Sequence, residues 1–262
     1  MVVGVLLVAA AGAVGCRGGG DAAGGGQAAG ADAHYTTLYN RGEYRAAYRA
    51  ASSASRRGST ADRAEAAYVA GLAAERIGDP AVAVRYLRRA AETGPADLAA
   101  DANASLGLAL HRLGRYDESA RRLYAAAEHL SGEDRARAYF HAGLSLQKLN
   151  RWPQARTALL LARDGTRDAA FRGQVERQLA VTGYTVQLGA FADVANARRQ
   201  AEAIAARARA ARLGAPRLVT ADEAGRTLTL VHVGRFTSYA AAQQAREALG
   251  DEAIVVPLAG RP

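Results

Sequence analysis

Residues 101–130 read DANASLGLALHRLGRYDESARRLYAAAEHL and decide the fold of the N-terminal part of the chain. Apolar residues recur at helical spacing through 101–113 and again through 116–130. Between the two stretches lies Gly114, and glycine tolerates the left-handed dihedrals that end a helix. The segment therefore predicts a helix, a glycine turn and a second helix.

This unit is repeated along the chain with a period of 36 residues. The slots that recur are the turn residue, a glycine inside the first helix, and a small residue and an apolar residue in the second helix. They are Gly42, Gly78, Gly114 and Asn150; Gly71, Gly107 and Gly143; Ala47, Ala83, Ser119 and Ala155; and Ala51, Leu87, Leu123 and Leu159. One unit cannot bury its apolar face alone, so the units must stack into a helical solenoid.

These slots resemble the tetratricopeptide repeat (TPR), whose period is about 34 residues. The resemblance covers four units in residues 34–167, and residues 168–183 are expected to form a capping helix and a linker. The first unit departs from the pattern, because Tyr35 stands where the other units have glycine. Such a departure suits a terminal repeat.

The TPR resemblance implies that the first helices of the units line a concave groove that binds a protein or peptide. The expected lining is Tyr68, Leu72, Glu75, Arg76, Leu108, His111, Arg112, Phe140, Leu144, Gln147 and Lys148. Arg76, Arg112 and Lys148 form a cationic row with the 36-residue spacing. Either this row holds an acidic segment or a terminal carboxylate of the partner, or it only complements the helix dipoles on a solvated face.

After Gly183 the periodicity changes from helical to alternating. Strands are expected within 184–191, 216–221, 227–236 and 252–257, helices within 194–212 and 238–249, and a turn at 221–226. The order β-α-β-β-α-β predicts an α+β domain with a four-stranded antiparallel sheet and two helices on one face. The opposite face of the sheet is left open.

Two phrases in this part are near copies, VQLGAF at 186–191 and VHVGRF at 231–236. Inside this element order they resemble the SPOR domain, a sporulation-related repeat, and we assign it to residues 184–262. The resemblance implies binding to peptidoglycan glycan strands that lack stem peptides. Such strands are enriched where cell-wall amidases act during division.

Strand alternation assigns the side chains of these phrases to the two faces. Val186, Leu188, Val231 and Val233 are expected in the core. The expected glycan-binding residues are Gln187, Leu230 and His232 on the open face, with Arg217 and Arg235 nearby. The alternative is an ordinary solvated sheet face without a ligand. Gly189 and Gly234 are expected to end the strands, and Phe191 and Phe236 to anchor the following loops.

The N-terminal residues suggest a targeting segment. Residues 2–14 are apolar or glycine, too short to span a membrane but of signal-peptide length. The run ends at Ala13-Val14-Gly15-Cys16, which resembles the lipobox of bacterial lipoproteins, although Ala13 replaces the preferred Leu. The resemblance implies a signal peptide at 1–16, lipidation of Cys16, and a periplasm-facing protein, on the outer membrane if the organism has one. Residues 17–33, rich in Gly and Ala, are expected to form a flexible tether.

Composition narrows the function classes. The 262 residues are 50% hydrophobic and 23% charged, which excludes wholesale disorder. The single Cys excludes an intramolecular disulfide framework and a Cys-based zinc site. The five His residues form no metal-binding spacing, and the chain has neither a nucleophile elbow nor a phosphate loop. We therefore expect no enzyme activity, no cofactor and no resident metal.

The sequence thus predicts a lipid-anchored envelope protein that binds peptidoglycan through its SPOR domain and a protein through its TPR groove. One alternative is a scaffold in which both domains bind protein. Another is nucleic-acid binding, since sheets of this order also bind RNA through exposed aromatic residues. The strands place no aromatic residue on the open face, which disfavours this last alternative.

Overall fold

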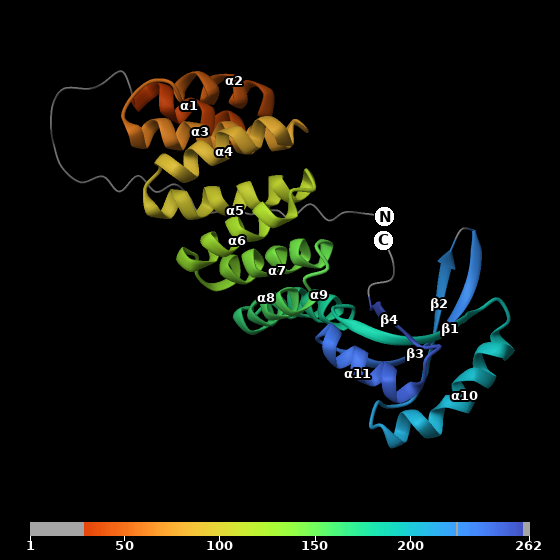
Figure 1. Ribbon diagram of the computed structural model, residues 1–262. Coiled ribbons are helices and arrows are strands. Elements are labelled where there is room, and N and C mark those ends of the chain that lie inside the picture. The colour runs from red at the N-terminus through yellow and green to blue at the C-terminus, as the bar shows by residue number, and fades with distance from the viewer. Residues whose placement is uncertain (1–28, 224, 259–262) are drawn as a thin grey trace.

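The computed structural model describes residues 29–223 and 225–258. Figure 1 shows a stack of helices followed by a separate sheet with two helices beside it. The predicted signal peptide, its Cys16 and most of the predicted tether lie outside the described residues. Within the described part, no helix is both long and apolar enough to cross a membrane.

The N-terminal domain is an α-solenoid of paired helices, as the repeat predicts. The pairs are α1 (Ala29–Asn40) with α2 (Tyr44–Ala54), α3 (Thr60–Arg76) with α4 (Pro80–Thr93), α5 (Ala96–Arg112) with α6 (Tyr116–His129), and α7 (Gly132–Lys148) with α8 (Trp152–Gly165), followed by α9 (Ala169–Ala180). Helix α1 starts at Ala29, so the coil expected through residue 33 is wrong for its last residues.

The turn slot has the same backbone geometry in all four repeats. Its φ angle is 81° at Gly42, 86° at Gly78, 73° at Gly114 and 56° at Asn150. Side chains other than Asn and Asp rarely tolerate this left-handed region, which explains the residue types in the slot. Identical turns repeat the same helix-to-helix geometry along the solenoid.

The helix glycines allow the two helices of a unit to touch. A Cβ atom on Gly71 would lie 2.5 Å from Cγ of Leu87, and one on Gly107 would lie 2.5 Å from Cγ of Leu123. In the last pair a Cβ on Gly143 would lie 2.8 Å from Cγ of Leu159. These leucines are at most 1% exposed, so each one fills the space that the missing side chain leaves.

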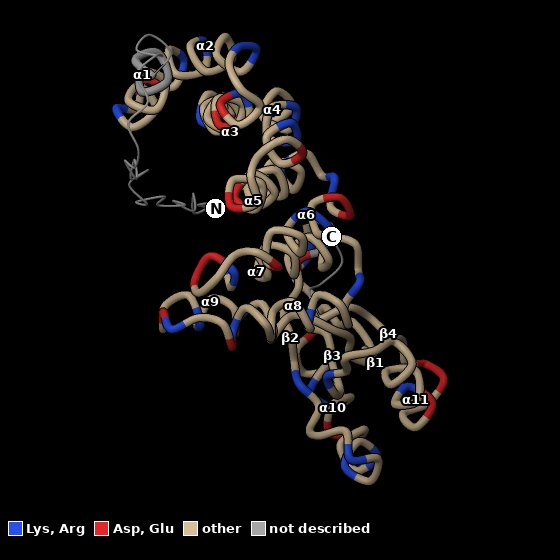
Figure 2. The backbone as a smooth tube through the Cα atoms, turned by 90° about the vertical axis from the view of Figure 1, so that its left-hand side faces the viewer, with Lys and Arg blue, Asp and Glu red and all other residues tan. Residues whose placement is uncertain are grey.

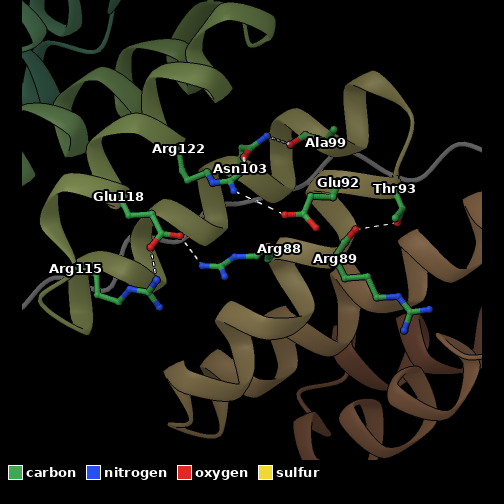
Figure 3. Close-up of polar contacts among 9 residues, drawn as sticks. All are labelled: Arg88, Arg89, Glu92, Thr93, Ala99, Asn103, Arg115, Glu118 and Arg122. Carbon is green, nitrogen blue, oxygen red and sulfur yellow. Dashed lines mark hydrogen bonds and ion pairs between the residues drawn. The ribbon is translucent and has the colours of Figure 1, made fainter.

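Ion pairs connect the outer helices of neighbouring units. Glu118 on α6 accepts from Arg88 on α4 at 2.5 Å and also from Arg115, and Arg122 lies 3.9 Å from Glu92 (Figure 3). These side chains are partly exposed, and such pairs contribute only about 0–1 kcal/mol each. Apolar packing therefore contributes most of the free energy of stacking. The ion pairs mainly set how charge is distributed on the outer surface.

The C-terminal domain has the predicted α+β architecture. Its elements are β1 (Tyr184–Phe191), α10 (Val194–Ala210), β2 (Arg217–Glu223), β3 (Arg226–Phe236), α11 (Tyr239–Leu249) and β4 (Ile254–Pro257), with antiparallel sheet order β2-β3-β1-β4. Both helices pack on one face, where Ile204 and Leu249 meet Val186, Val231 and Val233. The turn expected at 221–226 is shorter, because β2 continues to Glu223 and β3 starts at Arg226.

The two Gly-x-Phe phrases have a different role from the one expected. Both strands continue past the glycine to the phenylalanine, so Gly189 and Gly234 do not end them. A Cβ on Gly189 would lie 2.7 Å from the ring of Phe191, and one on Gly234 would lie 2.3 Å from the ring of Phe236. Each ring therefore folds back over its own glycine and packs against the core.

Aromatic side chains join the two domains. The ring of Trp152, at the start of α8, lies 6.2 Å from that of Tyr184, which lies 5.6 Å from that of Tyr239. Beside them, Nε2 of Gln147 donates to Oγ1 of Thr182 at 2.6 Å. The chain thus passes from the last repeat into β1 through a packed junction.

The glycine–leucine contact predicts the effect of Gly107→Ala. The added methyl group must displace Leu123, and overpacking of this kind costs about 1–3 kcal/mol. That cost exceeds the gain of up to about 1 kcal/mol from the helix propensity of alanine. Urea unfolding followed by far-UV circular dichroism measures the difference.

The matched control is Gly173→Ala in α9. A Cβ there meets only Nη1 of Arg177, at 3.7 Å, so this variant is expected to be as stable as the parent or more stable. Equal urea midpoints for the two variants would contradict the packing argument.

Candidate functional site

The open face of the sheet brings three of the predicted residues into one row. Arg217 on β2 pairs with His232 on β3, which pairs with Gln187 on β1, which pairs in turn with Ile254 on β4. Nε2 of His232 lies 3.4 Å from Oε1 of Gln187. This cross-strand row runs over the whole width of the sheet.

Leu230 and His232 face away from the helices, as alternation predicts, but they are not exposed. Each keeps only 7% of its surface accessible. Their strand, β3, lies between β1 and β2, so the side chains of both neighbours flank them. Leu230 and His232 are therefore wrong as direct contact residues and instead support the surface from below.

The two arginines lie close together near one end of this row. Nη2 of Arg217 donates to the carbonyl oxygen of Gly234 at 3.1 Å, and the side chain is half-buried. Burial lowers the pKa of Arg217, and the nearby charge of Arg235 lowers it further. Arg235 is exposed. A polar ligand on this side of the row therefore meets both the exposed Arg235 and the partly desolvated Arg217.

Apolar residues surround the row, and sequence reasoning missed them. Ile254 is 46% exposed, and Ala190, Val219 and Leu228 share its face by register and alternation. Residues 253–256 form a continuous apolar run without alternation, so the sequence alone does not mark Ile254 as the exposed one. A mostly apolar surface with a few placed polar groups is typical of ligand sites.

The predicted partner-binding residues lie on α3, α5 and α7, which contact one another in sequence; we call this the inner helix row. Tyr68, Leu72, Leu108 and Leu144 are half-buried there. Phe140 is wrong as a lining residue, since it is 1% exposed. Its ring packs against that of Phe171 at 5.3 Å, because α9 covers this part of α7.

The three cations of the inner helix row are all exposed but differ in their partners. Arg76 donates to the hydroxyl of Tyr44, and Arg112 pairs with Glu75 on the neighbouring helix. Lys148 has no ion pair within the described residues. Within the described residues Arg76 and Lys148 thus lack a carboxylate partner, which is compatible with both interpretations of the row, ligand binding and helix-dipole complementation.

His111 belongs to an internal network more than to the inner surface. Its Nδ1 lies 2.8 Å from Oγ of Ser145, and that oxygen lies 2.9 Å from Oγ of Ser119. Ser119 donates to the carbonyl oxygen of Gly107 at 2.7 Å. Burial lowers the pKa of His111, followed by the charges of Lys148 and Arg112, so neutral imidazole is favoured.

Carboxylates at the other end of the inner helix row form a feature that sequence reasoning missed. Asp97 and Asp101 lie in the N-terminal half of α5, and Asp134 lies in the first turn of α7. Burial raises the pKa of Asp101, and the charges of Asp134 and then Asp97 raise it further. The row thus has acidic and basic ends, each of the sign that the helix dipole favours.

Within the described residues, no cluster of three or more His, Cys, Asp or Glu side chains has the geometry to hold a metal ion. The arrangement of both surfaces suits binding by shape, hydrogen bonds and charge.

The environment of His232 predicts an unusual titration. Burial first and the charge of Arg217 second lower its pKa to about 4. Between about pH 6.5 and 4 the unfolded chain therefore binds a proton that the folded domain does not, and stability falls on acidification. NMR titration of the His232 ring should give a midpoint near 4, and a midpoint near 6.5 would show that the ring is solvated.

Comparisons with known proteins agree with this architecture. Residues 180–257 match the SPOR domain family. No curated protein matches the chain. Among solved structures, the "MamA RS-1 ArsTM double mutant" is similar, with 20% identity, a TM-score of 0.51, and coverage of 60% of this chain and 83% of that chain.

Two other solved structures show the same similarity. MamA residues 41 to the end from Desulfovibrio magneticus RS-1 has 22% identity, a TM-score of 0.50 and the same coverage of 60% and 83%. YrrB, described as a TPR protein with an unusual peptide-binding site, has 22% identity, a TM-score of 0.49 and coverage of 58% and 75%. At these identities the likeness concerns the fold alone. The chain is therefore a TPR-like helical solenoid that ends in a SPOR domain at residues 180–257, and a SPOR domain implies peptidoglycan binding.

Proposed function

We propose that the protein is a non-catalytic envelope adaptor that binds peptidoglycan glycan strands with its SPOR domain and a protein partner with its solenoid. The observation that carries the proposal is the cross-strand row on the open face of a sheet that matches the SPOR family. Both folds are binding folds, and their combination in one chain connects a partner to the cell wall.

The sheet face offers a sugar chain two kinds of contact. Ile254 and its apolar neighbours can pack against the C–H face of a sugar ring. The amide of Gln187 can donate to and accept from hydroxyl and N-acetyl groups, and Arg235 can donate. We therefore assign direct contact to Gln187, Ile254, Arg217 and Arg235, with Leu230 and His232 holding the surface from below.

The resemblance to the SPOR domain supports two further parts of the proposal. The protein prefers glycan strands without stem peptides, and it is located at division or wall-remodelling sites. The half-buried apolar residues of the inner helix row, with Lys148 exposed beside them, support a peptide or protein partner there. The alternative function is a scaffold in which the sheet face also binds protein, and an experiment on isolated cell wall separates the two.

Lipid anchoring through Cys16 completes the proposal. It is supported by the resemblance of residues 13–16 to a lipobox and by the Gly/Ala-rich segment that follows. Several acyl chains hold a protein firmly on a membrane, at about 0.8 kcal/mol per buried CH₂.

Pull-down of the full chain on purified sacculi tests glycan binding. Binding is expected to increase when the sacculi are first treated with an amidase that removes stem peptides. The double variant Gln187→Ala, Ile254→Ala should bind about five- to a hundredfold more weakly, since each lost contact contributes about 0.5–1.5 kcal/mol.

The control is Val194→Ala, because Val194 is also 46% exposed but lies at the start of α10, on the helix side of the sheet. This variant should bind like the parent. Unchanged binding of the folded double variant would move the site away from the sheet face, and absence of parent binding to any sacculi would favour the scaffold.

Membrane fractionation tests the anchor. The variant Cys16→Ala is expected in the soluble fraction, because the acyl chains are the proposed anchor. Metabolic labelling with a fatty acid should mark the parent and not the variant. Membrane association of both proteins without label would exclude lipidation.

A further inference from the structure

A cleft between the first and second repeats shares only Arg76 with the inner helix row of the proposed function. An open cavity of about 620 Å³ lies between the start of α2 and the end of α3. Its lining includes Glu43, Tyr44, Arg45, Ala46 and Arg49 from the α2 side and Arg76 from α3. The cleft is at the turn end of the repeat and uses no residue of the sheet face.

The charges around this cleft do not cancel. Three arginines and one glutamate line it, so the formal charge of the lining is +3 − 1 = +2. Arg45, Arg49 and Arg76 are exposed, and within the described residues none of them makes an ion pair. Three exposed guanidinium groups beside a single carboxylate leave a net positive lining that favours an anion.

The third repeat shows how the same slots are neutralised elsewhere in this chain. Two periods after Arg45 stands Asp117, which pairs with Arg121 and, at 2.6 Å, with Arg151. Two periods after Ala46 stands Glu118, which pairs with Arg88 and Arg115 (Figure 3). The first repeat keeps the arginine of the Arg121 slot, Arg49, but has lost both carboxylates. The second and fourth repeats also lack these carboxylates, but of the four repeats only the first has arginine in both the Arg45 and the Arg49 slots.

Arg76 is fixed in position for a ligand. Its Nη1 donates to the hydroxyl of Tyr44 at 3.2 Å, and its guanidinium lies 5.4 Å from the ring centroid of Tyr44 and 5.8 Å from that of Tyr39. Contacts with two aromatic rings hold the plane of the guanidinium and leave its other N–H groups free to donate.

The backbone of α2 adds further donors. The first turn of α2 contains no acidic residue, and the side chain of Glu43 does not cap it. Within the described residues, the N–H groups of Arg45 and Ala46 have no acceptor. Both residues line the cleft, at the positive end of the helix dipole, and helix N-termini of this kind bind anions.

We propose that this cleft binds a phosphate group, carried by a phosphate ester or diester. A phosphate offers several oxygens to separate guanidinium groups and to backbone N–H groups at once, which matches three arginines around one helix N-terminus. The same chemistry occurs in a phospholipid headgroup and in a soluble phosphate ester, and the experiment separates the two sources.

The test uses the full chain with Cys16→Ala, so that no acyl chain contributes. One arm measures binding of glycerol 3-phosphate by calorimetry. The other measures co-sedimentation with vesicles of phosphatidylcholine and with vesicles of phosphatidylcholine and phosphatidylglycerol in equal parts. Circular dichroism checks that each variant is folded.

The double variant Arg45→Gln, Arg49→Gln should lose about a hundredfold in affinity, at about tenfold for each guanidinium. Glu43→Gln should bind more tightly than the parent, because it removes the negative charge from the lining. The control Arg121→Gln removes a cation from the Arg49 slot of the third repeat, already paired with Asp117, and should leave binding unchanged.

If the parent binds the phosphatidylglycerol vesicles and the double variant does not, the proposal is supported and the source is a lipid headgroup. Binding of glycerol 3-phosphate without vesicle binding would support it and assign a soluble ester. Absence of binding in both arms would overturn the proposal. An equal loss in Arg121→Gln would also overturn it, because the effect would then follow net charge and not this cleft.

Discussion

The solenoid depends on one contact, a leucine of the second helix set against a glycine of the first. With the side chain absent at Gly71, Gly107 and Gly143, the paired helices approach until Leu87, Leu123 and Leu159 fill the gap. The 36-residue repeat of this contact, together with the left-handed turn residue, gives the second, third and fourth units the same shape, whereas the first unit has Tyr35 and Ala51 in these slots. Stacking then follows, since each unit has a second apolar face to cover.

A regular scaffold allows the same slot to carry different chemistry in different units. Basic and acidic residues are spread over both domains (Figure 2), and most of the described cations on the outer helices of the middle repeats have a carboxylate partner. The first repeat keeps the backbone geometry and changes the charges. The cavity at its turn consequently has a net positive lining.

The sheet domain differs from the solenoid because its two faces have separate roles. One face packs against α10 and α11, and the open face is available for binding. Val186, Val231 and Val233 are covered by α10 and α11 and set the register of the strands. With that register fixed, Arg217, His232, Gln187 and Ile254 must lie side by side. The aromatic junction at Trp152 and Tyr184 then attaches this domain to the last repeat.

The sequence by itself determined the periodic and alternating parts of the protein: the paired helices, the turn residues, the β-α-β-β-α-β order and the two faces of the sheet. These follow from local spacing, which a single chain displays directly. Only the tertiary structure decided which of the correctly oriented side chains are accessible. Phe140 is buried because α9 covers it, and His232 because two neighbouring strands flank it, whereas Ile254 stays exposed on the edge strand. Accessibility depends on which elements pack beside a residue, and that neighbourhood is set by contacts between segments far apart in the sequence.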